Sequence, residues 1–582
     1  MSKRDSWSLR IARWQNRWHA RRAAKTRPPT GFLSQPEPRT IGRVSTGQHL
    51  VSGQVLLAGH LIELEERSVW DVPAPSPAFV DALQGFGWMD DLAALGDRSA
   101  RDTAQDWTFE WIERYGDGRG PGWTPDLAGR RIIRWINHAV LLLSGQNAPN
   151  TNAFHLSLAQ QTLFLAKRWS AAPSGLPRFE ALTGLIYAGL SLKGMEGHVD
   201  LAADGLAAEC ASQVDDAGGI PTRNPEDLLE VFTLLNWAAL TLAESGRIAR
   251  PAHITAIERI APILRALRHA DGGLARFHGG GRGAEGRLDQ ALATSGVRSA
   301  AASGLAMGFA RLHGGRTSLI MDAAPPPDGD AGFDAHASTL AIEVTSGRRP
   351  MIVSCGSGAE FGANWHKAGR ATPSHSVLGL DGMSSSRLVG DGDWMRLTGG
   401  PHEVHAQPLI DEGLTGFVAG HDGYMHSHGL GHVRRIEMSS DGRMIHGEET
   451  LAAVSDAEKT KFDTALSRER GIPFSLRFHL HPDIDASLDL GGTAVSLALK
   501  SGEIWVLRYE GRHKLQIEPS VFLEKGRLEP RAAKQVVLSG AALDYATRIR
   551  WSLAKAQDTP VGLRDLVRDE PSGFDDDFEE PT

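Results

Sequence analysis

Apolar residues along the first half of the chain recur at the spacing of one helical face. The pattern runs from about Gly53 to Leu312, and turns rich in Gly, Pro and Asn interrupt it. Clear examples are the segments 130–144, 155–169, 179–192, 225–243 and 254–270. A long series of antiparallel helices with no strands between them must close on itself or stack as a solenoid to bury its apolar faces. No fixed-period repeat is visible, which disfavours a simple repeat array.

The pattern changes at Thr317, where short β-branched or alternating segments replace the helical spacing. Turn residues such as Ser-Gly, Asp-Gly and Gly-Gly separate them. The segments are 318–324, 338–347, 351–357, 375–382, 433–439, 474–482, 493–511 and 534–540. We therefore expect an antiparallel all-β domain of two packed sheets that runs to about Ala556.

The two ends of the chain differ from its body. The first 27 residues hold nine Lys or Arg and one Asp. A predicted helix there carries one apolar stripe, formed by Trp7, Ile11, Trp14 and Trp18, with Arg10, Arg13, Arg17 and Arg21 beside it. We expect the stripe to dock on the protein body, with peripheral membrane contact as the alternative. The residues after Arg568, with seven acids and no base, predict disorder.

These patterns predict four regions: a basic helix and linker (1–50), a helical domain (51–316), a β domain (317–556) and an acidic tail (557–582). The composition is globular, with 41% hydrophobic and 23% charged residues. A net charge of −8 gives no support for non-specific nucleic-acid binding. Arginines interrupt the N-terminus where a signal peptide would be apolar, so we expect a cytoplasmic protein, with a periplasmic or membrane-associated location as the alternative.

The stretch from Phe333 to Gly382 holds two strand-like segments, opened by His336 and His375. Two strands that begin with His can bring both imidazoles to one rim of a sheet. The stretch resembles the C-terminal domain of the heparinase II/III family of polysaccharide lyases, which has a His-x-His-Ala-Asp segment and a later Arg-x-Thr-x-x-His-Asn-Thr-like segment. Lesser matches are 107–138, 216–232 and 268–281. The resemblance implies an incomplete α/α toroid followed by an antiparallel β-sandwich, with the polysaccharide in the groove between them.

The resemblance implies cleavage of a uronic-acid glycan by β-elimination, which needs a base, a group that neutralises the sugar carboxylate, and an acid. Matching the family's proline to Pro225 gives Arg223 and Asn224 as neutralising residues. Asn224 also fits an ordinary helix N-cap. The family's catalytic Tyr falls at Asp227 and its first His at Asp334.

Other residues must then supply proton transfer in such a lyase. The candidates are His375, His336, Tyr424 and His421. The expected substrate contacts are Arg370, Arg434, Tyr115 and Trp123. His336 and His375 also match ligands of a structural zinc, with Cys355 as an uncertain third.

The first functional hypothesis is therefore a lyase whose partner is an acidic polysaccharide or oligosaccharide. The alternative is a catalytically altered or non-catalytic glycan-binding protein of the cell envelope, because Tyr and His are replaced by Asp227 and Asp334. A third hypothesis is a glycosidase that uses these two carboxylates as a pair.

Overall fold

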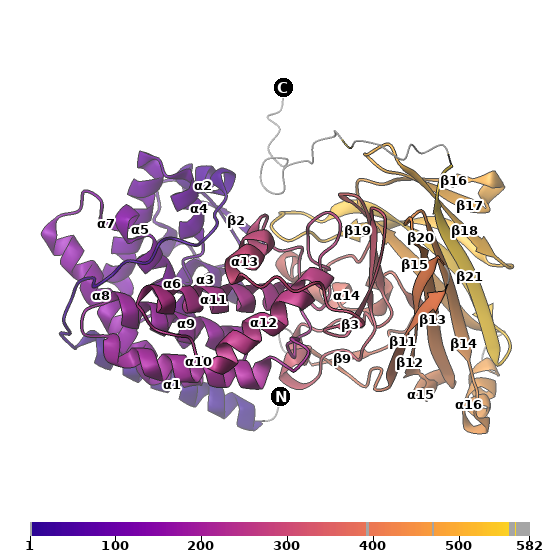
Figure 1. Ribbon diagram of the computed structural model, residues 1–582, viewed down its shortest axis with the longest axis horizontal. Coiled ribbons are helices and arrows are strands. Elements are labelled where there is room, and N and C mark those ends of the chain that lie inside the picture. Colours follow the sequence, from indigo (N-terminus) through magenta and orange to yellow (C-terminus); the bar gives the residue numbers. More distant parts are fainter. Residues whose placement is uncertain (1–2, 391–394, 412, 468–470, 558–564, 566–582) are drawn as a thin grey trace.

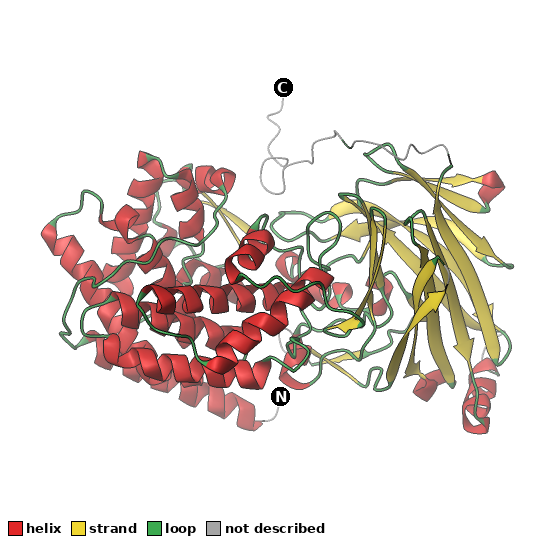
Figure 2. Ribbon diagram, in the orientation of Figure 1, coloured by secondary structure: helices red, strands yellow, loops and turns green. Residues whose placement is uncertain are grey.

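The computed structural model describes residues 3–390, 395–411, 413–467, 471–557 and 565. Helices form the N-terminal half and antiparallel sheets form the C-terminal half, side by side along the longest axis (Figure 1). The division between helix and strand is clear along the chain (Figure 2). The residues after 568, predicted to be disordered, lie outside the described residues.

The predicted helical segments are all helices, and proline or capping residues begin several of them. Pro125, Pro225 and Pro251 each occupy the first turn, where the missing amide proton costs nothing. The helices are α2 (Val44–Val51), α3 (Pro77–Gln84), α4 (Trp88–Leu95), α5 (Arg98–Tyr115), α6 (Pro125–Asn137), α7 (Ala139–Leu143), α8 (Ala148–Arg168), α9 (Leu176–Ser191), α10 (Val199–Gln213), α11 (Pro225–Glu244), α12 (Pro251–Ala266) and α13 (Arg287–Ser295).

A short hairpin interrupts the helical domain, where we expected no strands. Strands β1 (Gln54–Leu57) and β2 (His60–Glu63) pair with Leu57 opposite His60. The two residues between them, Ala58 and Gly59, both have positive φ angles, which is the backbone of a tight hairpin turn. The hairpin is too short to show a period of its own in the sequence.

Two antiparallel sheets make up the β domain, as predicted. One has the order β19 (Lys514–Phe522), β20 (Arg531–Ala542), β15 (Ile472–Leu480), β7 (Arg349–Val353), β6 (Ile342–Ser346), β5 (Thr317–Asp322), β4 (Phe309–Gly314) and β3 (Leu305–Ala306), and β8 (Leu378–Leu380) also pairs with β15. The other has the order β11 (Val404–Asp411), β12 (Leu414–Tyr424), β13 (Leu430–Ser439), β14 (Met444–Ala452), β21 (Ala546–Lys555), β18 (Ile504–Glu510), β17 (Ala494–Ala498) and β16 (Asp485–Asp489). Phe478 on β15 contacts Trp551 on β21 with ring centroids 4.9 Å apart, so the sheets pack face to face.

Smaller elements connect these strands. They are the pair β9 (Arg387–Val389) and β10 (Arg396–Thr398), and the helices α14 (Ala363–Gly369), α15 (Met425–His428) and α16 (Asp456–Leu466). The sheet also begins earlier than the predicted change at Thr317. β4 starts at Phe309 and pairs with β5, because residues 309–314 bury Phe309 and Leu312 against the sheet.

The N-terminal helix α1 (Lys3–Ala24) docks through a different face from the one we expected. Its buried residues Asn16, Ala20 and Ala23 face the body, and the Arg168 Nε of α8 donates a 2.7 Å hydrogen bond to the Asn16 Oδ1. The side chains of Trp7, Trp14 and Trp18 are 66%, 65% and 46% exposed. The prediction that the tryptophan stripe docks is therefore wrong, because the small alanines allow closer packing than the bulky indoles.

Within the described residues, no helix combines the length and the apolar character needed to cross a lipid bilayer.

Candidate functional site

The N-terminal end of α11 carries polar side chains where the helical domain meets the β domain. Asn224 caps this helix, and its Oδ1 accepts hydrogen bonds from the backbone amides of Glu226 (2.9 Å) and Asp227 (3.4 Å). Asn224 is 6% exposed, and its Nδ2 has no hydrogen-bond partner in the described part of the chain. The capping interpretation of Asn224 therefore accounts for its oxygen and leaves its amide group unused.

A run of three glycines packs against this helix end. The Gly281 amide donates a 2.8 Å hydrogen bond to Glu226 Oε2. A Cβ on Gly280 would collide with the Asn224 side chain, and a Cβ on Gly279 would lie 3.3 Å from the Cβ of Asp334 and 4.0 Å from Asn224 Nδ2. The absence of side chains on the loop thus lets Asp334, from the β domain, approach the start of α11.

Carboxyl groups whose pKa values are shifted in opposite directions, together with one lysine, complete this arrangement. We call it the boundary cluster, and it consists of Asn224, Glu226, Asp227, Asp334, His366 and Lys525. Lys525 Nζ lies 2.6 Å from Glu226 Oε2, and His366 Nε2 lies 3.6 Å from Asp334 Oδ1. Burial raises the pKa of Asp227 to about 6, although Lys525 opposes this. The nearby His366 imidazole lowers the pKa of Asp334, which is exposed.

Asp322, at the end of β5, lies at the centre of a buried network next to this cluster. Its carboxylate accepts hydrogen bonds from Arg223 Nη2 (2.5 Å) and Ser338 Oγ (2.7 Å), and lies 3.3 Å from His278 Nε2. Arg223 and His278 both have a φ of 48°, a conformation that non-glycine residues rarely adopt. Two strained residues therefore meet at one buried carboxylate.

The guanidinium of Arg223, expected to neutralise a substrate carboxylate, binds the protein itself. Besides Asp322, it donates to the carbonyls of Met307 (3.1 Å), Pro325 (2.7 Å) and Gly308 (3.2 Å). Arg223 thus joins the start of α11 to the β domain. This geometry favours a structural role for Arg223 over the substrate role predicted from the sequence.

His336 and His375 are brought together, with ring centroids 5.2 Å apart, but both are buried. His375 Nδ1 lies 2.9 Å from Ser354 Oγ, and burial lowers the pKa of His375 to about 3. Burial also lowers the pKa of His336 well below its usual value. Both ring nitrogens of His336, and Nε2 of His375, are buried without a hydrogen-bond partner in the described structure.

The residues around this pair do not fit the expected structural zinc. A closed zinc site uses four ligands, whereas the described residues include no group of three His, Cys, Asp or Glu placed to hold a metal. Cys355 Sγ lies instead 3.5 Å from His479 Nδ1, because neighbouring residues on an extended chain point to opposite sides. No step below is therefore assigned to a metal.

The predicted residues Tyr424, His421 and Arg434 lie inside the β-sandwich. The hydroxyl of Tyr424 donates to the Leu378 carbonyl at 3.3 Å, and burial raises the pKa of this phenol above its usual value. His421 Nε2 lies 3.2 Å from His432 Nδ1, and Arg434 Nε donates to a Glu449 carboxylate oxygen at 2.8 Å. These three side chains are at most 5% exposed, and none of them belongs to the boundary cluster.

The remaining predicted substrate contacts are also dispersed. Arg370 is fully buried and donates to the carbonyls of Gly332 (3.0 Å) and Ala335 (2.8 Å), so it holds the loop that carries Asp334. Trp123 is 3% exposed, and its Nε1 donates to the Tyr115 carbonyl at 2.9 Å. The structure thus brings neither aromatic residue to the boundary cluster.

Sequence reasoning missed several residues that the fold places here: Glu226, His278, His366 and Lys525. The glycine run and His278 belong to the segment 268–281, whose weak family resemblance was a usable signal. Lys525 lies 299 residues from its partner Glu226, and no local sequence pattern predicts that contact.

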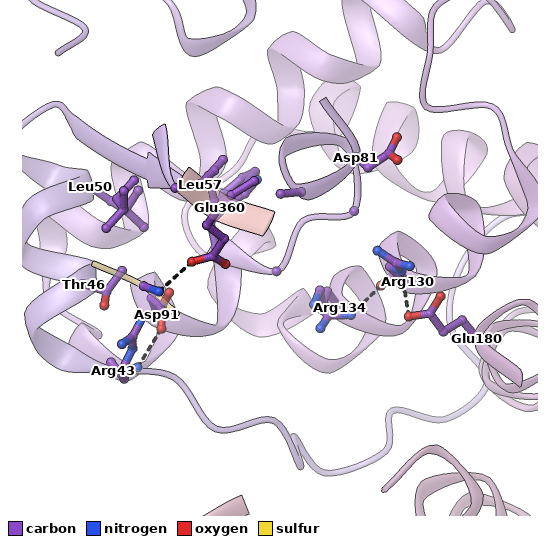
Figure 3. Close-up of a pocket in the computed structure, with 18 residues that line it drawn as sticks. Arg43, Thr46, Leu50, Leu57, Asp81, Asp91, Arg130, Arg134, Glu180 and Glu360 are labelled. Atoms are coloured by element: carbon purple, nitrogen blue, oxygen red, sulfur yellow. Dashed lines mark hydrogen bonds and ion pairs between the residues drawn. The ribbon is translucent and has the colours of Figure 1, made fainter. Parts of the chain in front are cut away.

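A cavity of about 350 Å³ lies in the helical domain, with part of its wall from the β domain (Figure 3). Helices α2, α3, α4, α6 and α9 and the β1–β2 hairpin line it, with Glu360 and Gly526 from the β domain. Arg130 Nε lies 2.7 Å from Glu180 Oε1, and burial raises the pKa of Glu180 to about 7. Gly526 follows Lys525 in the chain, although no residue of the boundary cluster itself lines this cavity.

Comparisons with known proteins show which family this chain resembles. Residues 296–552 match the model of the heparinase II/III-like C-terminal domain. The chain is 30% identical over 541 residues to FtsZ-localized protein C of Caulobacter vibrioides, and the match covers 91% of each chain.

The fold is similar to two solved lyase structures. Heparinase III matches with a TM-score of 0.65 at 11% identity, covering 93% of this chain and 89% of that one. The heparan sulfate lyase HepC of Pedobacter heparinus matches with a TM-score of 0.55 at 14% identity, covering 94% of this chain and 88% of that one. These matches confirm the predicted helical toroid followed by an antiparallel β-sandwich.

Proposed function

The chain belongs to the heparinase II/III family, and from this premise we propose that it binds a glycan at the boundary cluster without cleaving it by β-elimination. This is the glycan-binding alternative to the lyase. It combines the family's fold with a site whose side chains differ from those that elimination requires.

The composition of the boundary cluster carries this proposal. Elimination needs a base, an acid and a group that neutralises the uronate. Here Asp227 and Asp334 occupy the positions that match the family's Tyr and His, while the candidate replacements His375, Tyr424 and His421 are buried.

Charge also disfavours a uronate at this position. Lys525 is the cluster's amine, and it is already paired with Glu226 at 2.6 Å. A sugar carboxylate would lie near Asp227, Asp334 and Glu226, and like charges at short range repel. A neutral or amino sugar fits this environment better than an acidic one.

The test is a calorimetric titration of the full chain with neutral, amino-sugar and uronate oligosaccharides. We expect binding of a neutral or amino glycan, and about tenfold or greater weakening in Asp334→Ala, since a lost hydrogen bond to a charged group costs about 1.5–3 kcal/mol. Asp330→Ala, an exposed substitution in the same loop, is the matched control. Saturable binding of none of the glycans would contradict the proposal, as would ultraviolet absorbance from an unsaturated uronate product.

A second function is favoured by the exposed face of α1. Trp14 and Trp18 line a shallow pocket whose other residues are Arg17, Arg21, Arg22 and Lys25. Exposed indoles beside a row of cations suit the interface of an anionic membrane, where the rings enter the headgroup region and the cations meet lipid charge. We propose that α1 attaches the protein to such a surface.

Cosedimentation with vesicles tests this attachment. We expect binding to vesicles with anionic lipid, weaker binding to neutral vesicles, and loss of binding in the double variant Trp14→Ser/Trp18→Ser. Val140→Ser removes a 71% exposed apolar side chain elsewhere and is the control. Equal sedimentation of the double variant and the control would refute the role of α1.

The name of the related FtsZ-localized protein C suggests where such a membrane-attached protein could act. We propose that this chain also localises with FtsZ. Fluorescence microscopy of the tagged full chain together with labelled FtsZ tests this, and separate distributions would contradict it.

A further inference from the structure

We propose that Ser427, His428 and Asp381 form a second site, which hydrolyses the ester of a short acyl group such as acetate. Ser427 is its nucleophile, His428 is its general base, and Asp381 positions the imidazole. The site lies at the lower edge of the β domain in Figure 1, where α15 packs beside α16. It shares no residue with the boundary cluster, so it does not depend on the glycan binding proposed above.

Hydrogen bonds connect the three side chains in the order that acyl transfer requires. Ser427 Oγ lies 2.8 Å from His428 Nδ1, and His428 Nε2 lies 3.2 Å from Asp381 Oδ2. The other acceptor near the hydroxyl, the Tyr424 carbonyl, is more distant at 3.3 Å. A nucleophile, a base and a residue that orients the base, each within reach of the next, are the parts that covalent acyl transfer uses.

The carboxylate of Asp381 determines which nitrogen of His428 is the base. An ionised carboxylate only accepts hydrogen bonds, so Nε2 of the neutral imidazole carries the proton and donates it to Asp381. Nδ1 is then the acceptor for the Ser427 hydroxyl. The two nitrogens have the reverse assignment from that in serine proteases, but each can take a proton when the other is held by a carboxylate.

A tight turn positions this carboxylate. Asp381 and Gly382 follow β8 and have φ angles of 51° and 64°, the backbone of an Asp-Gly turn. The Asp381 amide donates a 2.7 Å hydrogen bond to the Pro473 carbonyl of β15. The turn is thus fixed beside the start of β15, where its carboxylate meets the imidazole of His428.

The short helix α15 carries the other two side chains, and α16 supports it. α15 ends at Gly429, where a Cβ would lie 2.1 Å from the Glu458 carbonyl oxygen of α16. So close an approach leaves little room for the helix to move. His428 is 7% exposed, whereas Ser427 is an exposed residue. The base is therefore fixed in the protein, while the nucleophile is open to an incoming ester.

A pocket beside the three residues is suited to a small acyl group. All three line a cavity of about 70 Å³, whose other walls come from Ala465, Gly471, Ile472 and Pro473. One water molecule needs about 10–15 Å³ of such volume, so the cavity has room for an acetyl group but not for a long acyl chain. The apolar walls favour a methyl group, and the carboxylate of Asp381 disfavours an anionic one.

The reaction balances with water as the co-substrate. Ser427 Oγ bonds to the ester carbonyl carbon while His428 Nδ1 takes the hydroxyl proton. The bond from that carbon to the alcohol oxygen breaks, and the alcohol leaves with the proton from His428. Water then attacks the acyl carbon and gives a proton to His428 Nδ1, and the Ser427 oxygen leaves and regains that proton. The products are one alcohol and one carboxylic acid.

The first experiment traps the acylated serine. The full chain is mixed with p-nitrophenyl acetate near neutral pH, release of p-nitrophenol is followed by absorbance, and quenched samples are digested for mass spectrometry. We expect one acetyl group on the peptide that carries Ser427, and loss of this label in Ser427→Ala. We expect kcat to fall at least about 100-fold in His428→Gln, the smaller end of what a general base contributes.

Two exposed residues nearby provide matched controls. Ser467→Ala removes a hydroxyl that donates to the Thr464 carbonyl instead of to a histidine. His426→Gln removes an exposed imidazole, which measures the background from direct attack of a surface histidine on the activated ester. We expect both controls to keep the wild-type rate and label. Thermal unfolding of every variant checks that it is folded.

Asp381 acts through His428, so its variant is examined by pH dependence. In Asp381→Asn the imidazolium formed during acylation loses its carboxylate partner. We therefore expect the acid limb of the kcat–pH profile to move to lower pH, and kcat to fall at least about tenfold with the lost charged hydrogen bond. A purely structural role would lower the rate without moving the profile.

Three results would overturn the inference. The first is acetylation spread over surface side chains, with Ser427→Ala as reactive as the wild type. The second is label on Ser427 that His428→Gln leaves unchanged, which would make Ser427 an exposed hydroxyl without a base. The third is a wild type that neither takes the label nor releases p-nitrophenol. None of these results bears on the proposed glycan binding.

Discussion

Asp322 is one of the residues that join the two domains. Its carboxylate binds Arg223, 99 residues earlier in the chain, and the loop residue Ser338. Arg223 and the neighbouring His278 both have strained backbones, which persist when surrounding contacts fix them. The sequence offered Arg223 as a substrate residue because it precedes Asn-Pro, but the side chain's partners come from distant segments that no local pattern reveals.

Removing this carboxylate should destabilise the protein strongly. We expect Asp322→Asn to lower the free energy of unfolding by about 3–5 kcal/mol, because it leaves the buried charge of Arg223 without its partner. Urea denaturation followed by circular dichroism measures the loss. Asp485→Asn is the control, since its carboxylate is exposed and pairs with an exposed lysine. A loss below about 1 kcal/mol would show that Arg223 is satisfied by its carbonyl partners alone.

At the scale of elements, α11 and the glycine loop against it build the site. The residues Asn-Pro-Glu-Asp predict a helix start at Pro225, and the structure confirms it. The contact of Gly279–Gly281 with that start is tertiary, so a sequence pattern could not place it. In α1 the pattern predicted the helix but assigned its docked face wrongly, because alanines and an asparagine make the contact instead of tryptophans.

Adding one methyl group to the loop should disturb the helix cap. In Gly280→Ala the new Cβ would collide with the Asn224 side chain. Losing this cap costs about 1 kcal/mol, and we expect glycan binding to weaken as the Asn224 amide moves. Thermal unfolding and calorimetry measure the two effects. Gly197→Ala is the control because a Cβ there meets nothing within 4 Å. Unchanged glycan binding would show that the Asn224 amide does not contribute to it.

Across the whole molecule, buried histidines make stability depend on pH. Burial lowers the pKa of His278, His336, His375, His421, His432 and His479, all of which are buried. A histidine that resists protonation when folded supports the fold fully above its unfolded pKa, and this support is lost as the pH falls below it. Carboxyl groups whose pKa values are raised by burial oppose this trend, among them Asp91, Glu180 and Asp227.

Substitution of one histidine measures its contribution to the pH dependence of stability. The pKa of His375 is about 3 in the folded protein. From pH 7.5 to pH 5 we therefore expect the wild type to lose about 2 kcal/mol of stability relative to His375→Asn. Urea denaturation at both values measures the difference. His426→Asn, at an exposed position, is the control. If the difference in free energy of unfolding between wild type and His375→Asn were the same at both pH values, His375 would have the same pKa in the folded and unfolded states.

The sequence by itself determined a helical half followed by a β half, because periodicity, caps and turn residues act over short distances, and its motifs indicated the family. The resemblance also implied that Asp227 and Asp334 stand where the family has its Tyr and His. Only the tertiary structure decided which polar residues meet: Lys525 reaches Glu226 across 299 residues, and His375, Tyr424 and Arg434 turn into the protein interior. The physical reason is that burial and pairing of charges depend on contacts between segments far apart in the chain, which local patterns do not record.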